Sequence, residues 1–235
     1  MMNKSNINFV QKVFSEVPET YEKVNHILTL GLDLIWRKKA ARIAARFGGK
    51  RWVDVCTGTG EMAVYLSQLA PKGTKVQAVD FSTSMLAEAR KKPEAEKVEF
   101  LTADIKKLPF KDESIDVITI SFATRNINLN REVLIQSFAE FRRVLKPDGL
   151  FVNLETSQPA FSMIRKLFHL YIKLFVKQIG SRISGSSDGY SYLSKTIPKF
   201  YDALKLADIL REAGFAEVTF QKMLLGIAAI HQARK

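Results

Sequence analysis

A glycine-containing turn between two apolar segments constrains the fold of this chain more than any other feature. The apolar segment 51–56 runs into Thr-Gly-Thr-Gly at 57–60 and then into a helix-like segment, and a second apolar segment, 75–80, ends at Asp80. Glycines let the backbone approach a ligand closely, and a carboxylate about twenty residues further on accepts hydrogen bonds from ribose hydroxyls. The pattern therefore predicts a strand–helix–strand unit that binds a nucleoside-bearing cofactor.

Strand-like and helix-like segments alternate after this turn. The last two strand-like segments, 216–221 and 226–232, are too close in sequence for a crossover helix and predict an antiparallel hairpin. The expected class is α/β, with a Rossmann-like, doubly wound, seven-stranded and mostly parallel sheet that ends in this hairpin, as in class I methyltransferases. Before the hairpin we expect strands at 51–56, 75–80, 97–102, 115–121 and 149–156, and helices at about 60–70, 82–92 and 131–145.

The remaining segments are expected to be helical additions to one domain. The length of 235 residues, with 46% hydrophobic and 26% charged residues, is typical of a single globular domain spanning 1–235. Helices are expected over about 7–47, with a break near Pro18. A helical insertion over about 160–210, interrupted by a polar loop at 180–189, is expected to cover the active-site crevice.

Cysteine content and apolar run length indicate where the chain resides. Cys56 is the single cysteine, so no intramolecular disulfide can form, which suits a reducing cytoplasm. We find no export signal and no run of about eighteen apolar residues. We therefore expect a cytoplasmic protein, with peripheral contact at the inner face of the membrane left open. The three histidines, His26, His169 and His231, are isolated in sequence, and no metal site is expected.

The cofactor could be a nicotinamide dinucleotide or S-adenosylmethionine. The segment 58–63 also satisfies the G-x-G-x-x-A dinucleotide pattern, so a nicotinamide-dependent oxidoreductase stays an alternative. Asp54 at the end of the first strand and Asp104 after the third favour S-adenosylmethionine. Glu61 points the same way, because a carboxylate beside the turn would repel a pyrophosphate.

Further motifs over nearly the whole chain resemble the ubiquinone/menaquinone biosynthesis C-methyltransferase family. The most particular are Phe-Ala-Thr-Arg-Asn at 122–126 and Gly-Ile-Ala-Ala-Ile-His at 226–231. Others are Val-Phe-Ser-Glu-Val at 13–17 with Tyr21 and Asn25, Gly31 with Trp-Arg-Lys at 36–38, Leu-Pro-Phe at 108–110, Arg-Val-Leu-Lys-Pro at 143–147 and Tyr-Ser-Tyr-Leu at 190–193.

This resemblance implies S-adenosylmethionine-dependent methylation of a ring carbon of a polyprenylated quinol, with demethylmenaquinol converted to menaquinol. It also implies cofactor contacts at Thr59, Asp80, Asp104, Ile105 and Ser121. The full set of candidate cofactor-binding residues is Asp54, Gly58, Thr59, Gly60, Asp80, Phe81, Asp104, Ile105 and Ser121.

Two positions depart from the family's pattern. Cys56 stands where the general methyltransferase pattern has its first glycine, a change that could alter only packing under the loop. Asp33 stands where members often carry histidine, which leaves a carboxylate base and a solvated helix residue as alternatives.

Arg125 and Asn126 are the candidate catalytic residues. A ring carbon becomes nucleophilic when a neighbouring phenol ionises, and a free phenol titrates near 10. The permanently charged guanidinium of Arg125 could hold the phenolate or an activated water, and Asn126 could orient the same oxygen. The alternative for Arg125 is a helix cap or a surface ion pair.

The net charge of +12 is concentrated in part in segment 161–177, which contains no acidic residue. Its lysines, with His169, follow one helical stripe, and Ile164, Leu167, Phe168, Tyr171, Leu174 and Phe175 form an apolar face. Such a helix could rest on a lipid surface or, alternatively, pack on the sheet or in a homodimer. Nucleic acid is an unlikely partner, because no RNA-binding module is visible, although methylation of RNA or of another small molecule stays open.

Overall fold

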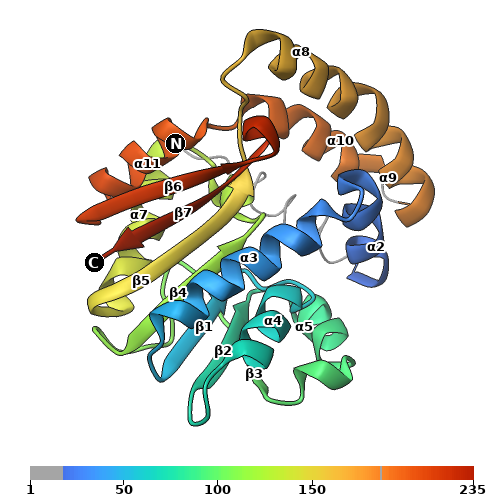
Figure 1. The fold of residues 1–235 in the computed structure, drawn as a ribbon. Helices are drawn as coiled ribbons and strands as arrows, with labels where there is room; N and C mark the ends of the chain where they lie inside the picture. Colours follow the sequence, from blue (N-terminus) through green and yellow to red (C-terminus); the bar gives the residue numbers. More distant parts are fainter. Residues whose placement is uncertain (1–17, 186) are drawn as a thin grey trace.

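A seven-stranded sheet in the order β3-β2-β1-β4-β5-β7-β6 forms the centre of the molecule (Figure 1). The computed structural model describes residues 18–185 and 187–235, so the helix expected over 7–17 lies outside the described residues. The strands are β1 (Arg51–Val55), β2 (Lys75–Asp80), β3 (Val98–Thr102), β4 (Ile115–Ser121), β5 (Leu145–Thr156), β6 (Glu217–Met223) and β7 (Ala228–Arg234).

The strand pairing confirms the expected fold class. Strands β1 to β5 pair in parallel, and β7 runs antiparallel to both β5 and β6. β5 begins at Leu145, earlier than the expected 149, because Leu145 already pairs with Ile115 before an irregularity in the ladder. Alternating apolar strands and amphipathic helices thus build the doubly wound sheet that the sequence predicts.

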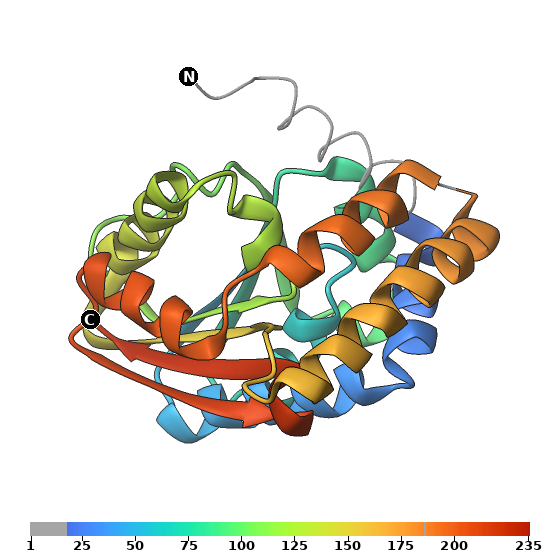
Figure 2. The ribbon, with the colours of Figure 1, turned by 90° about the horizontal axis from the view of Figure 1, so that it is seen from above.

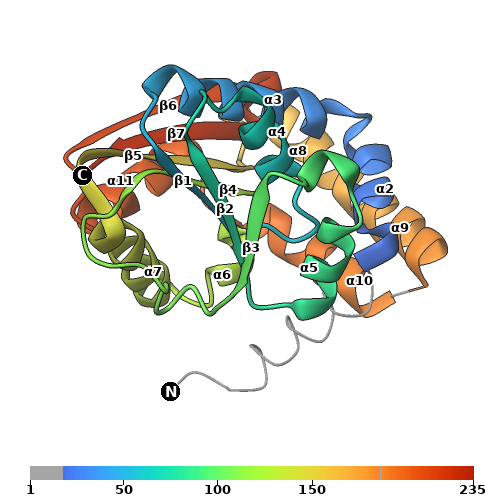
Figure 3. The same ribbon diagram turned by 90° about the horizontal axis from the view of Figure 1, so that it is seen from below.

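Helices cover both faces of the sheet, as Figure 3 shows. On one face lie α3 (Leu32–Phe47) and α4 (Glu61–Leu69), and on the other α7 (Arg131–Val144) and α11 (Ala203–Glu212). α5 (Thr83–Arg90) contacts β2 and β3, η1 (Pro93–Ala95) follows it, and α6 (Thr124–Ile127) directly follows β4. The α7 face is centred on a group of buried phenylalanines: Phe138, Phe141, Phe151 and Phe215.

Capping side chains start several of these helices. The Asn130 side chain accepts a hydrogen bond from the Val133 N–H at the start of α7, and Asp202 accepts one from Lys205 at the start of α11. Such caps satisfy backbone donors that have no partner within the helix, so they fix where each helix begins.

A second helical layer stands beside the carboxyl ends of the strands (Figure 2). α2 (Pro18–Thr29) packs on α9 (Lys177–Ser184), which follows α8 (Ser162–Tyr171) and the π-helical turn η2 (Ile172–Val176). α10 (Ser187–Thr196) and η3 (Ile197–Lys199) complete this layer, and η4 (Leu224–Gly226) joins β6 to β7. Its own small core consists of Val24, Phe168, Ile172, Val176, Tyr190 and Ile197.

The expected polar loop at 180–189 is wrong, because α9 and α10 occupy most of it. Gly180 is buried where the two helices meet, and a Cβ there would lie 2.2 Å from the Tyr190 ring. This glycine therefore serves close helix packing and does not mark a turn.

Within residues 18–185 and 187–235, no helix combines the length and apolar character needed to span a bilayer.

Candidate active site

A cavity of about 150 Å³ opens at the carboxyl ends of β1, β2 and β4. The chain leaves β1 toward β2 and β3 and later returns to place β4 on the other side of β1. Ligands of open α/β sheets bind at this kind of switch point, because the loops on either side diverge there. Eight of the sequence-predicted residues line the cavity: Gly58, Thr59, Asp80, Phe81, Asp104, Ile105, Ser121 and Asn126.

The turn after β1 is tied to β2 by backbone and carboxylate hydrogen bonds. The Gly58 N–H donates to Asp80 Oδ2 at 2.8 Å, and the Ser82 N–H donates to Asp80 Oδ1 at 2.9 Å. Burial raises the pKa of Asp80, and the backbone donors oppose that rise. Each carboxylate oxygen can accept a further hydrogen bond, so Asp80 can still receive hydroxyl donors of a ligand.

The two glycines of the turn have different roles. Gly58 has φ +56° and open space where a Cβ would lie, so nothing obstructs a ligand from approaching this backbone. Gly60 has φ +81°, and a Cβ there would lie 3.0 Å from Ala89 and 3.3 Å from the Phe100 ring. Gly58 therefore opens the cavity, whereas Gly60, which does not line it, permits close packing beneath the turn.

Asp54 does not line the cavity and lies beneath the turn. Its side chain is almost fully buried and accepts hydrogen bonds from Thr57 Oγ1 and Thr119 Oγ1, each at 2.6 Å. Burial raises the pKa of Asp54 to about 7, against the effect of these hydroxyl donors. As placed, Asp54 acts on the turn through Thr57 and has no direct path to a ligand.

Strained backbone flanks the switch point on both sides. Cys56 after β1 has φ +52°, and Phe122 after β4 has φ +54°. Residues other than glycine pay a steric cost in this region, and such residues cluster at functional sites. Cys56 lines the cavity, and burial raises its thiol pKa well above the usual value, so the thiol stays protonated. The departure at Cys56 therefore changes the cavity wall and the backbone strain as well as the packing.

The two candidate catalytic residues point in different directions. Asn126 lines the cavity, and its Oδ1 is buried with no hydrogen-bond partner among the described residues. Arg125 does not line it: Nη1 donates to Thr196 Oγ1 at 2.9 Å, and its backbone N–H donates to Glu155 Oε2 at 3.0 Å. The surface position considered for Arg125 is wrong, because this side chain is 7% exposed.

Tyr21 connects Arg125 electrostatically to the cavity. Tyr21 lines the cavity, and burial raises its pKa, whereas the charges of Arg37 and Arg125 lower it. Burial also raises the pKa of Tyr192, on α10, and the charge of Arg125 lowers it. Arg125 is thus a buried positive charge close enough to Tyr21 to lower its pKa.

A buried ion-pair network joins α2, α3 and the start of α4. Arg37 Nη1 donates to Asp33 Oδ2 at 2.5 Å and lies 3.3 Å from Glu61 Oε2. His26 lies 2.9 Å from Asp33 through Nδ1 and 3.4 Å from Glu61 through Nε2. The Arg37 guanidinium also lies 4.9 Å from the centroid of the Phe122 ring.

Asp33 is a buried member of this network, so the solvated alternative for it is wrong. Burial acts to raise its pKa, but the hydrogen bond from Thr29 and the charge of Arg37 hold it below the ordinary value. A carboxylate with a lowered pKa is a weak base near neutral pH, so Asp33 is better placed to fix Arg37 than to accept a proton.

His26 is not isolated in space, although it is isolated in sequence. Ligand atoms of Glu22, His26 and Glu61 lie within 4.8 Å of one another, close enough to hold a metal ion. Lys92 pairs with Glu22, however, and Arg37 pairs with Glu61, so the two carboxylates already have countercharges. The cluster therefore supports no metal assignment.

No local pattern in the sequence indicates a role for Tyr21 or Arg37, and Glu61 served only to choose between cofactors. All three line the cavity. The spacing of Asp33 and Arg37, one helical turn apart with opposite charges, was the one local signal of this network. Which side chains α2 and α3 would turn toward the cavity depends on tertiary packing, which no local pattern shows.

Comparisons with known proteins agree with this geometry. The family model described as the ubiE/COQ5 methyltransferase family matches residues 1–235. A demethylmenaquinone methyltransferase from Clavibacter sepedonicus is 37% identical over 227 residues, covering 96% of this chain and 90% of the relative. The ubiquinone/menaquinone biosynthesis C-methyltransferase UbiE from Paracoccus denitrificans is 36% identical over 236 residues, covering 99% and 92%.

A solved structure shows the same fold. The S-adenosylmethionine-dependent methyltransferase from Thermotoga maritima, described as a possible histamine N-methyltransferase, superposes with a TM-score of 0.68 at 19% identity, covering 96% of this chain and 99% of the other. The expected class I methyltransferase fold is confirmed, and the family match decides for a methyltransferase over a nicotinamide-dependent oxidoreductase. By a match that spans its whole length, this chain belongs to the ubiE/COQ5 methyltransferase family.

Proposed function

We propose that this protein transfers a methyl group from S-adenosylmethionine to a ring carbon of a polyprenyl quinol, converting demethylmenaquinol to menaquinol. The observation that carries the proposal is the family match over residues 1–235, with relatives named for this reaction that align over 90% or more of their length. The cavity at the switch point supplies the matching site, lined by Thr59, Asp80, Asp104 and Ser121.

The residues present suit this cofactor. Asp80 can accept the ribose hydroxyls, and Asp104 and Ile105, after β3, can border the adenine. Gly58 leaves open space beside the turn, so a ligand can approach the backbone closely. When bound, S-adenosylmethionine supplies an electrophilic methyl group.

Residues that follow β4 at one wall of the cavity can orient the acceptor and stabilise negative charge on its ring. Methylation at carbon requires electron density that appears when a ring hydroxyl ionises, so the protein must stabilise phenolate character. Asn126 Oδ1, which has no hydrogen-bond partner among residues 18–185 and 187–235, can accept a hydrogen bond from a ring hydroxyl. The buried charge of Arg125 lies close enough to Tyr21, a cavity residue, to lower its pKa. In this arrangement Asn126 orients the acceptor, and Arg125 stabilises the negative charge that develops on it.

Replacement of Arg125 tests this role. Arg125→Ala removes the buried charge, so we expect turnover with the reduced acceptor to fall by about 100-fold or more, the effect typical of losing one preorganised electrostatic group. S-adenosylmethionine affinity, measured by calorimetry without acceptor, should stay within about threefold, and Arg125→Lys should recover part of the turnover because it restores the charge. Arg131→Ala, at an exposed arginine, is the control. Normal turnover in Arg125→Ala would remove Arg125 from the mechanism.

A membrane-facing surface beside the cavity would admit a lipid-soluble acceptor. Exposed apolar side chains gather on α8 and η2, in the α2–α3 turn and at the η4 tip between β6 and β7. These segments adjoin one another, since Tyr171 donates to the Leu28 carbonyl and Gly226 lies against Pro159. We name this surface the apolar end; its exposed members are Leu30, Phe161, Met163, Leu167, Leu170, Leu174, Phe175, Leu224 and Leu225.

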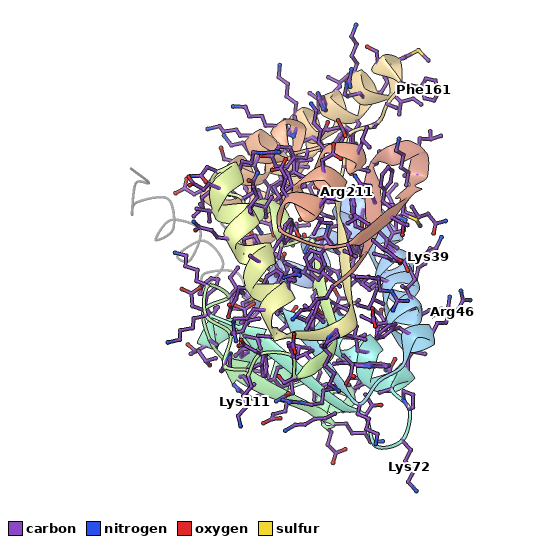
Figure 4. All side chains as sticks on the ribbon, turned by 90° about the vertical axis from the view of Figure 1, so that its left-hand side faces the viewer. Lys39, Arg46, Lys72, Lys111, Phe161 and Arg211 are labelled. Atoms are coloured by element: carbon purple, nitrogen blue, oxygen red, sulfur yellow. The ribbon has the colours of Figure 1, made fainter. Side chains whose placement is uncertain are left out.

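The charge around the apolar end complements an anionic lipid surface. Arg165, Lys166, Lys173 and Lys177 are exposed on the same helical segment, and no acid occurs between residues 161 and 187. Phe161 projects from the end of the molecule opposite Lys72 (Figure 4). Lys72 precedes β2, so the apolar end lies toward the carboxyl ends of the strands, where the cavity opens. Apolar side chains flanked by lysines are typical of helices that lie in the bilayer interface.

One detail of the expected apolar face is wrong. Phe168 is buried and, with Ile172 and Val176, packs in the small core of the second helical layer, and His169 contacts Gln158 at 2.7 Å. The segment therefore has two apolar sides, one that holds α8 on the protein and one that is exposed. Only the exposed side is proposed to contact lipid, and a homodimer through this surface is the competing outcome. The cytoplasmic location stays a prediction.

A further inference from the structure

We infer that Arg37 and Glu61 form a subsite for the amino-acid part of the cofactor, in which Arg37 binds the carboxylate and Glu61 binds the ammonium. This inference rests on the proposed function in one respect only, namely that S-adenosylmethionine occupies the cavity. Both side chains line that cavity, beside the turn that carries Gly58 and Thr59.

Arg37 has unused donors that suit a carboxylate. A guanidinium carries five N–H donors, and the contacts to Asp33 and Glu61 both involve Nη1. Nε is buried and has no hydrogen-bond partner within the described part of the chain. A buried donor left unpaired is costly, and a ligand carboxylate can accept from two donors of one guanidinium at once. The arginine is 4% exposed, so this donor lies in an enclosed site where such bonds are strong.

Neighbouring groups hold Arg37 in place before any ligand arrives. Asp33 fixes Nη1 from the same helix, and the Phe122 ring lies under the guanidinium. Burial acts to lower the Arg37 pKa, but the carboxylates of Glu61 and Asp33 raise it, so the guanidinium remains charged. Little side-chain entropy is then lost on binding, which favours affinity.

Glu61 is placed to receive the cationic end of the same group. It is the first residue of α4, directly after Gly60, and it lies between Arg37 and His26. With both carboxylates ionised, Arg37, Asp33 and Glu61 together carry a net negative charge. Burial raises the pKa of Glu61, and an ammonium group bound beside it would favour its ionised form. S-adenosylmethionine carries a carboxylate, an ammonium and a sulfonium, and its net positive charge complements this subsite.

The alternative is that Arg37 binds the phenolate of the acceptor. Arg37 also contacts the Phe122 ring, which follows β4 as Asn126 does, so its place in the cavity does not by itself separate the two ligands. Its ion pair with Glu61, the first residue of α4 directly after the glycine turn, favours the cofactor. Measurements of cofactor binding in the absence of any acceptor separate the two assignments.

The test compares S-adenosylmethionine with one ligand that lacks only the carboxylate and one that lacks the whole amino-acid part. Calorimetry on the full chain would measure the affinities of S-adenosylmethionine, decarboxylated S-adenosylmethionine and 5′-methylthioadenosine, which lacks the whole amino-acid part. A charge-assisted, two-donor contact should make wild-type protein prefer S-adenosylmethionine over its decarboxylated form by about 10- to 100-fold. Arg37→Gln should abolish that preference while changing 5′-methylthioadenosine affinity less than about threefold. Arg42→Gln, an exposed position of the same helix, should leave all three affinities unchanged.

Each outcome decides between the possible assignments. An equal loss of affinity for all three ligands in Arg37→Gln would assign Arg37 a structural role and overturn the inference. Equal affinities of the wild type for S-adenosylmethionine and its decarboxylated form would also overturn it. If Arg37→Gln fails to fold, the wild-type ligand comparison and Glu61→Gln decide, because Glu61→Gln should weaken S-adenosylmethionine by about tenfold relative to 5′-methylthioadenosine. Absence of any S-adenosylmethionine binding by the wild type would instead contradict the proposed function itself.

Discussion

At the scale of single residues, the site is shaped by side chains beneath and beside the turn as much as by those that face the cavity. Asp54 supports the turn through Thr57, Gly60 permits packing against Ala89, and Cys56 bends the chain at φ +52°. Polar groups at strand ends were easy to identify in the sequence, because motifs mark them. Whether each faces the ligand or the protein interior depended on neighbours far away in the chain, such as Thr119.

The backbone at Cys56 reverses the usual ranking of alanine and glycine. The left-handed conformation costs a residue with a Cβ atom roughly 1 kcal/mol of folding free energy, and it costs glycine nothing comparable. We therefore expect Cys56→Gly to have a free energy of unfolding about 1 kcal/mol higher than Cys56→Ala, measured by urea denaturation. At a helix interior the order would be the opposite. An alanine variant as stable as the glycine variant would show that the backbone is unstrained here.

The raised pKa of Asp54 makes stability depend on pH in a definite direction. The folded carboxyl titrates at about 7. The unfolded one titrates near 3.9, so between these values the folded state binds the extra proton. The free energy of unfolding should therefore fall as pH rises from about 4 to 7 and level off above that range. Asp54→Asn cannot titrate and keeps a polar group beside Thr57 and Thr119. Its stability should decline less over this window.

Denaturation of wild type and Asp54→Asn at several pH values from 4.5 to 8 checks this. The difference between the two proteins should shift in favour of the variant as pH rises, by up to about 1.4 kcal/mol for each unit by which the pKa is raised. A difference that does not depend on pH would mean that Asp54 titrates normally in the folded protein.

At the scale of elements, the apolar end combines parts of the chain that are distant in sequence. α8 contributes Leu167, and the η4 tip contributes Leu225, which is 66% exposed and has φ +55°. An exposed leucine in a strained turn conformation is unfavourable in water, so its presence points to a role in contact. Segment 161–177 was recognisable in the sequence because it is basic and apolar. The contribution of the hairpin tip was not, because only the fold brings it beside Pro159.

Vesicle binding measures the role of this surface. Wild type should cosediment with vesicles that contain phosphatidylglycerol and bind poorly to neutral phosphatidylcholine, and added salt should weaken the binding. Leu167→Gln and Leu225→Asn should each reduce binding several-fold, about the loss expected for one interfacial leucine. Asparagine tolerates the left-handed region, so Leu225→Asn should not lose stability.

Leu204→Ser, which changes an exposed leucine of α11, is the matched control and should bind as wild type does. Vesicle binding that does not depend on anionic lipid and is unchanged in both Leu167→Gln and Leu225→Asn would reject lipid contact. A dimer in solution that Leu167→Gln dissociates would assign the same surface to a second copy of the chain.

At the scale of the whole molecule, the sequence predicted the sheet well and the second helical layer less well. Periodicity placed the strands, because each buries an alternating or continuous apolar face against neighbouring helices, and the short separation of the last two strands predicted the closing hairpin. The polar segment at 180–189 was misjudged, since Gly180 and its serines resemble a loop unless the Tyr190 ring packed on Gly180 is known.

The candidate site was predictable where local motifs encode it. Gly58, Asp80 and Asn126 line the cavity as expected for residues that follow strands of a doubly wound sheet. The wall formed by Tyr21 and Arg37 could not be predicted, because it depends on how α2 and α3 pack across the carboxyl ends of the strands. The residues favoured S-adenosylmethionine but left the nicotinamide alternative open, which the family match decided, and the acceptor rests on family membership alone.

The position of the transferred methyl group distinguishes carbon methylation of the quinol from every other reaction considered for this protein. Purified protein would be incubated with S-adenosylmethionine carrying a ¹³C-methyl group and with demethylmenaquinol kept reduced, and the product would be examined by NMR spectroscopy and mass spectrometry. Carbon methylation of the reduced ring predicts one added methyl group bonded to a ring carbon, and no transfer to the oxidised quinone. A methyl group found on oxygen, or equal transfer to reduced and oxidised rings, would contradict it.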